Sequence, residues 1–140
     1  MKIHIATVEG EVYRATACSI VATTTNGELK IFAHHAPLLA ILRPGIVRID
    51  CLPGCNCPEV KRDEMVILGG FIEVQPDTVT ILADAVERSG QLDSSRTREA
   101  VEHARERFRT APPENAEKAL MELEAALARL IVATRLSRRH

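Results

Sequence analysis

The sequence predicts an α+β fold in which an antiparallel β-sandwich or barrel, residues 1–86, precedes an antiparallel two-helix hairpin, residues 87–140. The first observation is a change of period: apolar residues recur at every second position in the first part and at spacings of three and four in the second. The second is that turn residues interrupt the first part at short intervals, with no helical stretch between them. This pattern is typical of antiparallel sheets.

The strands are predicted from short alternating segments. Val47, Ile49 and Cys51 alternate with Arg48 and Asp50, which would place one set inward and the other outward. Glycine, proline and asparagine separate such segments, and we expect these residues to form turns between strands. The turn signals are Gly10, Asn26-Gly27, Pro44-Gly45, Pro53-Gly54, Gly69-Gly70 and Pro76-Asp77.

The second part contains signals for the start and stop of two helices. Asp93 is a candidate N-cap for the first helix, Pro112-Pro113 would end it, and a second helix should begin near Glu114. Two helices joined by so short a connection pack antiparallel. The first helix offers few apolar side chains, so the hairpin must lean on the sandwich or on another protein. The expected buried positions are Val101, Ala104, Phe108, Leu120, Leu123, Leu127 and Leu130.

Composition excludes several classes of protein. The chain is 46% hydrophobic and 26% charged, which fits a globular domain, and no apolar run approaches the length of a membrane span. A net charge of −1 and the lack of a basic stripe with aromatics argue against a nucleic-acid partner. We find no nucleophile–base or carboxylate pair in a supporting motif, and aromatics are too few to line a pocket. An enzyme or a ligand-holding module is therefore disfavoured.

Four cysteines, at positions 18, 51, 55 and 57, raise the question of a metal site. Structural zinc sites usually combine two knuckles of closely spaced cysteines, and "CLPGCNC" has neither that spacing nor a second knuckle. The N-terminal "MKIHIATVEG" alternates instead of forming a signal-peptide core, so nothing suggests export. We therefore expect reduced thiols and no metal, with a metal or redox role and a local disulfide as alternatives.

The second helix is acidic at its start and basic at its end. Its basic residues at the end are Arg129, Arg135, Arg138 and Arg139. One interpretation is that this polarity complements the helix dipole. The other is that the basic end docks on an acidic surface of a partner.

Three segments resemble the epsilon subunit of the bacterial F-type ATP synthase. They are "GELKIFAHHAPLLAILRPGIVRI", "LGGFIEVQPDTVTILADAVER" and "LDSSR", in the order and at the spacing of that family. The resemblance implies a sandwich of about ten strands followed by a mobile helical hairpin. It also implies a non-catalytic rotor subunit at the foot of the central stalk, on the cytoplasmic face of the bacterial membrane and not inserted in it.

The resemblance also implies partners and contact residues. The sandwich would bind the gamma subunit, and Glu28 and His35 fall where the family contacts the polar loops of the c-ring. The extended hairpin would reach the alpha and beta subunits and restrain ATP hydrolysis, with Arg135, Arg138 and Arg139 as candidate contacts. His34 stands where the family more often has glycine or another small residue.

Some members of that family bind ATP on the folded hairpin. The first helix opens with Leu92, Asp93 and Arg96, which match the start of that motif, and Arg129 occupies a plausible position on the second helix. Asp can accept a hydrogen bond from an adenine amine, and Arg can pair with phosphates. Thr97 and His103 depart from the motif, so we expect no resident cofactor and at most weak ATP binding. The alternative is an N-cap followed by an exposed arginine.

Overall fold

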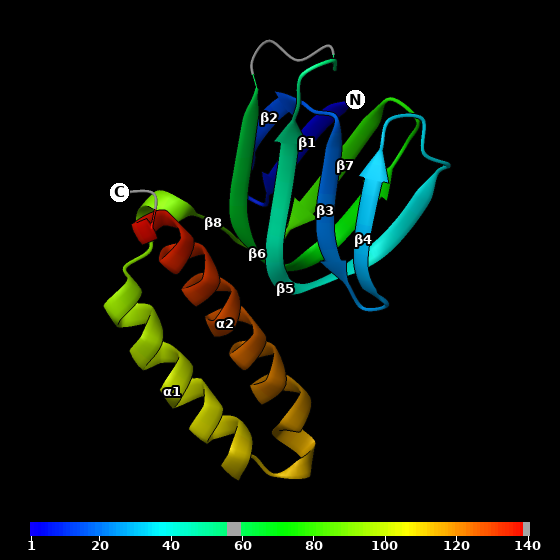
Figure 1. The fold of residues 1–140 in the computed structure, drawn as a ribbon. Helices are drawn as coiled ribbons and strands as arrows, with labels where there is room; N and C mark the ends of the chain where they lie inside the picture. The colour runs from blue at the N-terminus through cyan, green and yellow to red at the C-terminus, as the bar shows by residue number, and fades with distance from the viewer. Residues whose placement is uncertain (56–59, 139–140) are drawn as a thin grey trace.

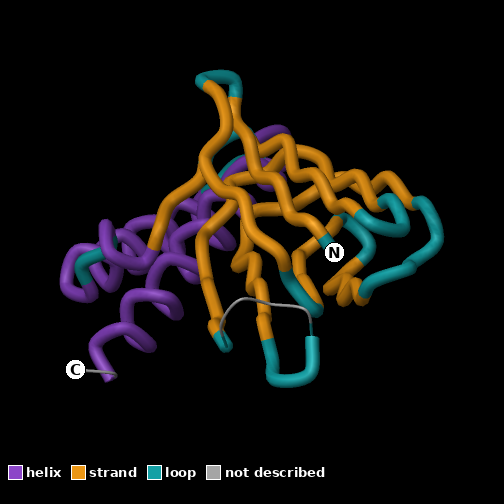
Figure 2. Tube along the Cα trace, turned by 90° about the horizontal axis from the view of Figure 1, so that it is seen from above, coloured by secondary structure: helices purple, strands orange, loops and turns teal. Residues whose placement is uncertain are grey.

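The computed structural model describes residues 1–55 and 60–138, which form a β body with a helical hairpin at its side (Figure 1). The view from above places both helices at one side of the strands (Figure 2). In the described part of the chain, no helix is both long and apolar enough to span a membrane. The strands are β1 Lys2–Thr7, β2 Gly10–Thr16, β3 Ser19–Thr24, β4 Gly27–Phe32, β5 Leu38–Cys51, β6 Lys61–Val74, β7 Thr78–Ala83 and β8 Val86–Arg88.

The strands are hydrogen-bonded in the order β2-β1-β7-β6-β5-β3-β4, and β8 pairs with β6. Neighbouring strands run antiparallel, as predicted, except that β1 runs parallel to β7. The parallel pair forms because β7, distant from β1 in the sequence, pairs with the edge of β1 that β2 leaves free. β8 carries the strands on to Arg88, across the expected boundary at residue 86.

Two long strands, β5 and β6, bend and so take part in both layers of a sandwich. Their register passes from Leu42 opposite Gly70 to Pro44 opposite Leu68, with the pair between them left out. The second half of β6 pairs with β7, whereas its first half pairs with β8. With each long strand counted as two halves, the eight strands of the described residues correspond to the expected ten.

The predicted turns at Pro44-Gly45 and Gly69-Gly70 are therefore wrong, because both pairs lie inside strands. The two glycines of the second pair do adopt positive φ, 109° and 126°, as the sequence suggested. Positive φ serves a bend within β6 there, and does not end the strand.

The core of the β body is aliphatic, as expected from the few aromatics. Isoleucines dominate it, and seven strands contribute to it, from β1 to β7, directly or through packed neighbours such as Tyr13. Alternation along each strand places these side chains inside. The fully enclosed isoleucines are Ile3, Ile5, Ile20, Ile31, Ile49, Ile67, Ile72 and Ile81.

The hairpin forms where the sequence predicts it. After the short η1 (Ser89–Gln91), helix α1 spans Ser94–Thr110; η2 (Pro113–Asn115) then leads into α2, Ala116–Arg138. Asp93 caps α1, since its Oδ1 accepts the backbone N–H groups of Ser95 at 2.8 Å and Arg96 at 3.2 Å.

The packing of the hairpin differs from the predicted leucine stripe. Val101 and Ala104 are buried as expected and pack on Ala126, but Leu127 and Phe108 are among the exposed apolar residues. Most buried residues of α2 are alanines because this helix lies between α1 and the body, where only small side chains fit (Figure 1). Toward the body, Ala128 and Val132 pack on Val66 of β6.

Candidate interaction surfaces

An apolar stripe crosses the outer face of three neighbouring strands. Ile41 on β5 lies opposite Phe71 on β6, which in turn lies opposite Leu82 on β7. These side chains are 53%, 51% and 57% exposed. Leu39, two residues before Ile41 on the same face of β5, is more exposed still. A contiguous apolar patch on a sheet face indicates a protein–protein interface.

Sequence reasoning missed this stripe. A signal was present, because Ile41, Phe71 and Leu82 occupy outward positions of alternating strands where polar residues are expected. Recognising it requires knowing which strands are neighbours. β5 and β6 follow each other in the chain. Which of their residues face the core and which face outward becomes clear only when the positions of the two bends are known.

Of the residues predicted to face a c-ring, Glu28 is the second residue of β4, whereas His35 lies beyond the other end of β4, in its connection to β5. Both are exposed. His35 Nδ1 donates to the carbonyl of Ala36 at 2.7 Å, so its ring lies along the turn that follows β4. The described residues contain no group of three or more His, Cys, Asp or Glu side chains that could hold a metal ion.

His34 has a left-handed backbone, with φ of 65°, at the position where a glycine or small residue was expected. Its N–H donates to the carbonyl of Pro76 at 2.9 Å, and its Nδ1 lies 4.0 Å from the carboxylate of Asp77. These contacts hold the turn against the β6–β7 connection. The turn is therefore fixed in spite of the unfavourable residue.

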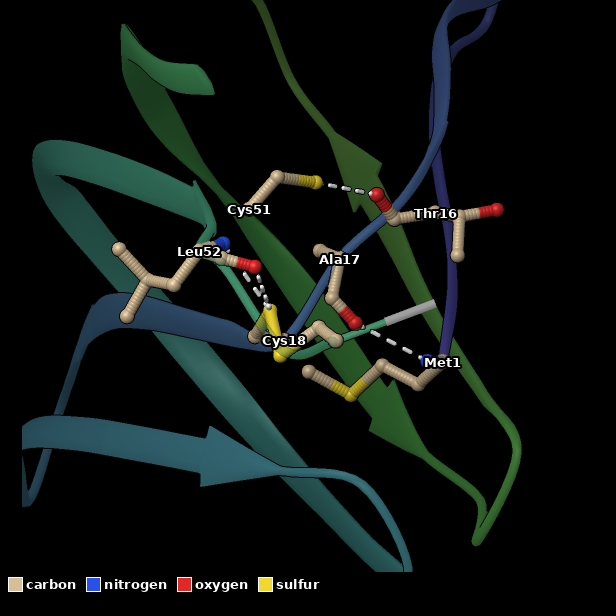
Figure 3. The surroundings of a disulfide bond; sticks show 7 residues. Met1, Thr16, Ala17, Cys18, Cys51 and Leu52 are labelled. Carbon is tan, nitrogen blue, oxygen red and sulfur yellow. Dashed lines mark hydrogen bonds between the residues drawn. A yellow bond between two sulfur atoms is a disulfide. The ribbon is translucent and has the colours of Figure 1, made fainter. Parts of the chain in front are cut away.

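A disulfide joins Cys18, between β2 and β3, to Cys55 in the loop after β5 (Figure 3). The prediction of reduced thiols is wrong for these two residues, and the bond is not local, since 37 positions separate them. They meet because the Cys18 N–H donates to the carbonyl of Asp50 at 2.8 Å, which places the β2–β3 connection beside the end of β5. Cys51 is buried, with its thiol donating to the Thr16 carbonyl, and Cys57 lies outside the described residues.

The three residues predicted for nucleotide binding line one cavity of about 410 Å³ at the base of the hairpin. Asp93 and Arg96 enter it from the start of α1, and Arg129 enters it from α2. The Arg129 guanidinium is already bound, because its Nε and Nη2 donate to the Glu87 carboxylate at 2.7 and 2.8 Å. This contact raises the pKa of Arg129 and pairs its guanidinium with a carboxylate of the chain itself.

Further charge pairs connect α2 to the body. Arg43 on β5 donates to Glu124 at 3.0 and 2.7 Å and lies 3.0 Å from Glu117. These two carboxylates raise the pKa of Arg43, with Glu124 the larger cause. Near the other end of α2, Arg135 donates to Glu64 of β6 at 2.6 Å.

Of the three arginines predicted to contact catalytic subunits, Arg135 is thus engaged within the chain. Arg138 is exposed at the end of α2, and Arg139 lies outside the described residues. The body contributes residues that the sequence did not point to, namely Arg43, Glu64 and Glu87. No local signal marks them, because each meets its partner from a distant part of the chain.

Comparison with known proteins agrees with these features. Residues 1–89 match the family described as the beta-sandwich domain of the ATP synthase delta/epsilon chain. The ATP synthase epsilon chain of Neisseria meningitidis serogroup C is 37% identical, over 94% of this chain and 88% of its own length. The epsilon chain of Nitrosospira multiformis is 36% identical, over 98% and 95%, and that of Halalkalibacterium halodurans is 37% identical, over 96% and 98%.

Two solved structures share the fold. A chain of the Euglena gracilis mitochondrial ATP synthase, in a structure of OSCP, F1 and c-ring, superposes with a TM-score of 0.74 at 20% identity, covering 95% of this chain and 79% of that one. A chain from the central stalk and c-ring of the Tetrahymena thermophila enzyme gives 0.52 at 15%, covering 97% and 95%. Both matches extend over the body and the hairpin together. With the family match and the sequence relatives, they lead to one conclusion: this chain belongs to the epsilon chain family of ATP synthase.

Proposed function

We propose that this chain is a non-catalytic subunit of the central stalk, which couples rotation of a c-ring to the gamma subunit and restrains ATP hydrolysis through its hairpin. In this proposal it lies at the cytoplasmic face of a bacterial membrane as a peripheral part of the synthase. The observation that carries the proposal is the apolar stripe of Ile41, Phe71 and Leu82. A rigid sheet with an exposed apolar row suits a lasting contact with another subunit.

The gamma subunit is the partner proposed for this stripe. Phe71→Ser and Leu82→Ser each remove apolar area from its centre, and we expect each to weaken gamma binding by roughly 10- to 100-fold. The matched control is Phe32→Ser, because Phe32 is 57% exposed on β4, away from the stripe in the sheet order. Surface plasmon resonance with immobilised gamma would measure all three. Equal losses for Phe71→Ser and Phe32→Ser would contradict the assignment of this face.

The c-ring contact is proposed for Glu28, near the start of β4, and for His35, in the connection that follows β4. Both side chains are exposed. Replacing them together by alanine should lower ATP-driven proton pumping in reconstituted synthase without lowering gamma binding. Loss of gamma binding in that variant would place these residues in the wrong interface.

The restraint of hydrolysis is proposed for the hairpin in an extended position, where its basic end would reach the alpha and beta subunits. Arg138 and Arg139 are the residues to reverse, because Arg135 also holds the folded hairpin. Arg138→Glu with Arg139→Glu should raise the ATPase rate of the assembled enzyme, and less so at high salt. An unchanged rate would favour the interpretation that these charges complement the helix dipole.

Weak ATP binding at the base of the hairpin remains part of the proposal. The cavity lined by Asp93, Arg96 and Arg129 supports weak binding. The Glu87 carboxylate already pairs with the Arg129 guanidinium, so a phosphate of ATP would have to compete with it. Isothermal titration with Mg-ATP should detect binding only at high concentration, and Arg96→Gln should abolish it. Tight binding by the native chain would mean that Glu87 moves aside.

A further inference from the structure

The acidic part of α2 faces a single arginine of the body. Arg43, at the bend of β5, contacts Glu124 through two donors and reaches Glu117 through a third nitrogen. These carboxylates lie two helical turns apart on the same side of α2. One guanidinium therefore spans the acidic half of the helix.

The basic part of α2 faces carboxylates of the body. Arg129 pairs with Glu87 of β8 through two hydrogen bonds, and Arg135 pairs with Glu64 of β6. The side chain of Glu64 is only 11% exposed, so this carboxylate is largely enclosed where α2 lies over the sheet. The body thus presents charges opposite to both halves of the helix.

On the α2 side, the apolar contact between these pairs is made by small side chains. Ala128 and Val132 pack on Val66, with the larger Ile46 and Leu68 of the body beside them. Small side chains specify register poorly, because a helix can slide along them. A slide of one turn would bring Leu120 or Ala128 to the place of Glu124, and neither can bind Arg43.

We propose that the charge polarity of α2 is an ionic latch, which fixes the register of the hairpin on the body and makes its hold dependent on ionic strength. Arg135 is the shared element of this latch, because it cannot serve an outside partner while Glu64 binds it. The sequence left two interpretations of this polarity, the helix dipole and an external partner. The geometry supplies a third, in which the polarity is complementary to the chain's own β body.

The strength of the latch follows from its partial exposure. Pairs of this kind contribute modestly in water, so removing one should raise the population with a detached hairpin by roughly two- to fivefold. The three sites act on one rigid helix, and their effects should multiply. Salt should weaken the latch, since the side chains remain within reach of solvent ions.

The test uses the isolated full-length chain. Lys2 and Glu99 are each replaced by an unnatural amino acid with a ketone side chain, and a spin label is attached to each ketone. Both positions are exposed, the first on β1 and the second on α1. Pulsed electron resonance then measures the distribution of distances between body and hairpin. Hydrogen exchange of the α2 amides provides a second measurement, because it detects rare openings that a distance distribution misses.

The variants are Glu64→Gln, Arg135→Gln and the charge swap that combines Glu64→Arg with Arg135→Glu. Both single variants should enlarge the detached population two- to fivefold, and the swap should return it toward the native level. The control is Glu102→Gln, because Glu102 pairs with Arg105 inside α1 at 3.7 Å and not with the body. Two outcomes would contradict the proposed latch. One is a detached population that changes neither with Glu64→Gln nor in 500 mM salt. The other is a charge swap that leaves the detached population as large as in the single variants.

The consequence for activity rests on the proposed function and has its own measurement. In assembled synthase, Glu64→Gln should increase inhibition of ATP hydrolysis because it frees the hairpin and Arg135 together. Arg135→Gln also frees the hairpin but removes one contact, so it should inhibit less than Glu64→Gln. Distances that respond while the ATPase rate does not would support the latch and contradict only the inhibitory role.

Discussion

Gly70 should be among the positions of β6 least tolerant of substitution. A Cβ built on it would lie 2.0 Å from the carbonyl oxygen of Leu82 and 2.9 Å from the Cα of Ala83, and both atoms belong to the backbone of β7. Its φ of 126° is also in a region that L-residues rarely adopt. Gly70→Ala therefore forces β7 away from β6 and strains the strand at the same time.

A comparison of three glycines separates the cost of backbone strain from the cost of displacing β7 in the free energy of unfolding. Gly90 has no positive φ and open space around it, so Gly90→Ala should change the free energy of unfolding by no more than about 0.5 kcal/mol. Gly27 has a φ of 109° but also open space, so Gly27→Ala isolates the backbone strain, about 1–2 kcal/mol. Gly70→Ala adds a displacement of packed backbone, about 1–3 kcal/mol, for about 2–5 kcal/mol in all.

Urea unfolding of the full chain, followed by far-ultraviolet circular dichroism, measures the three free energies on one scale. Because Gly70 precedes Phe71, the same variant should also weaken gamma binding if it remains folded. A cost for Gly70→Ala no larger than that for Gly27→Ala would refute the reasoning. It would mean that β7 moves aside freely and that the bend does not lock the two strands together.

Two further predictions concern stability. Reducing the bond between Cys18 and Cys55 should lower the free energy of unfolding by up to about 4 kcal/mol, the chain-entropy value for a loop of this length; urea midpoints with and without dithiothreitol measure it, and a double serine variant should not respond to reductant. Burial and the hydrogen bond that Tyr13 donates to Asp63 at 2.5 Å raise the pKa of Tyr13, so the folded state favours the neutral phenol. Its contribution is then fully present below about pH 10, the ordinary value, and is lost as pH rises above it. Tyr13→Phe should remove that loss above pH 10 and leave the pH dependence below pH 10 unchanged, and an identical pH dependence in both proteins above pH 10 would contradict it.

Local signals in the sequence predicted what depends on neighbouring residues. Asp93 caps α1, Pro112 and Pro113 follow its end, and the change of period near residue 86 separates strands from helices. Each of these features involves backbone groups within a few positions of one another, which is why residue type alone indicates them. The family motifs belong to the same class, because they are continuous segments.

The sequence-based prediction is wrong where two different structures satisfy the same local backbone requirement. Gly69 and Gly70 need positive φ, and a turn and a bend within a strand both satisfy that need. Only the neighbours of β6 decide between them, because β6 pairs with β5 before and after the bend, and with β7 from Gly70 onward, so the strand is not ended there. His34 shows the converse, since distant contacts with the β6–β7 connection hold a conformation that its residue type disfavours.

The sequence by itself determined the class of fold, the start and end of the helices, the aliphatic core and the family, because these follow from periodicity, capping and continuous motifs. The tertiary structure alone decided which charges meet across the hairpin, which outward positions join into an apolar stripe, and which cysteines bond. Arg43 and Glu124 are far apart in the chain, as are Glu64 and Arg135. The stabilisation from each ion pair depends on how two separate elements pack together. The residue pattern along one strand or helix does not indicate which element lies opposite.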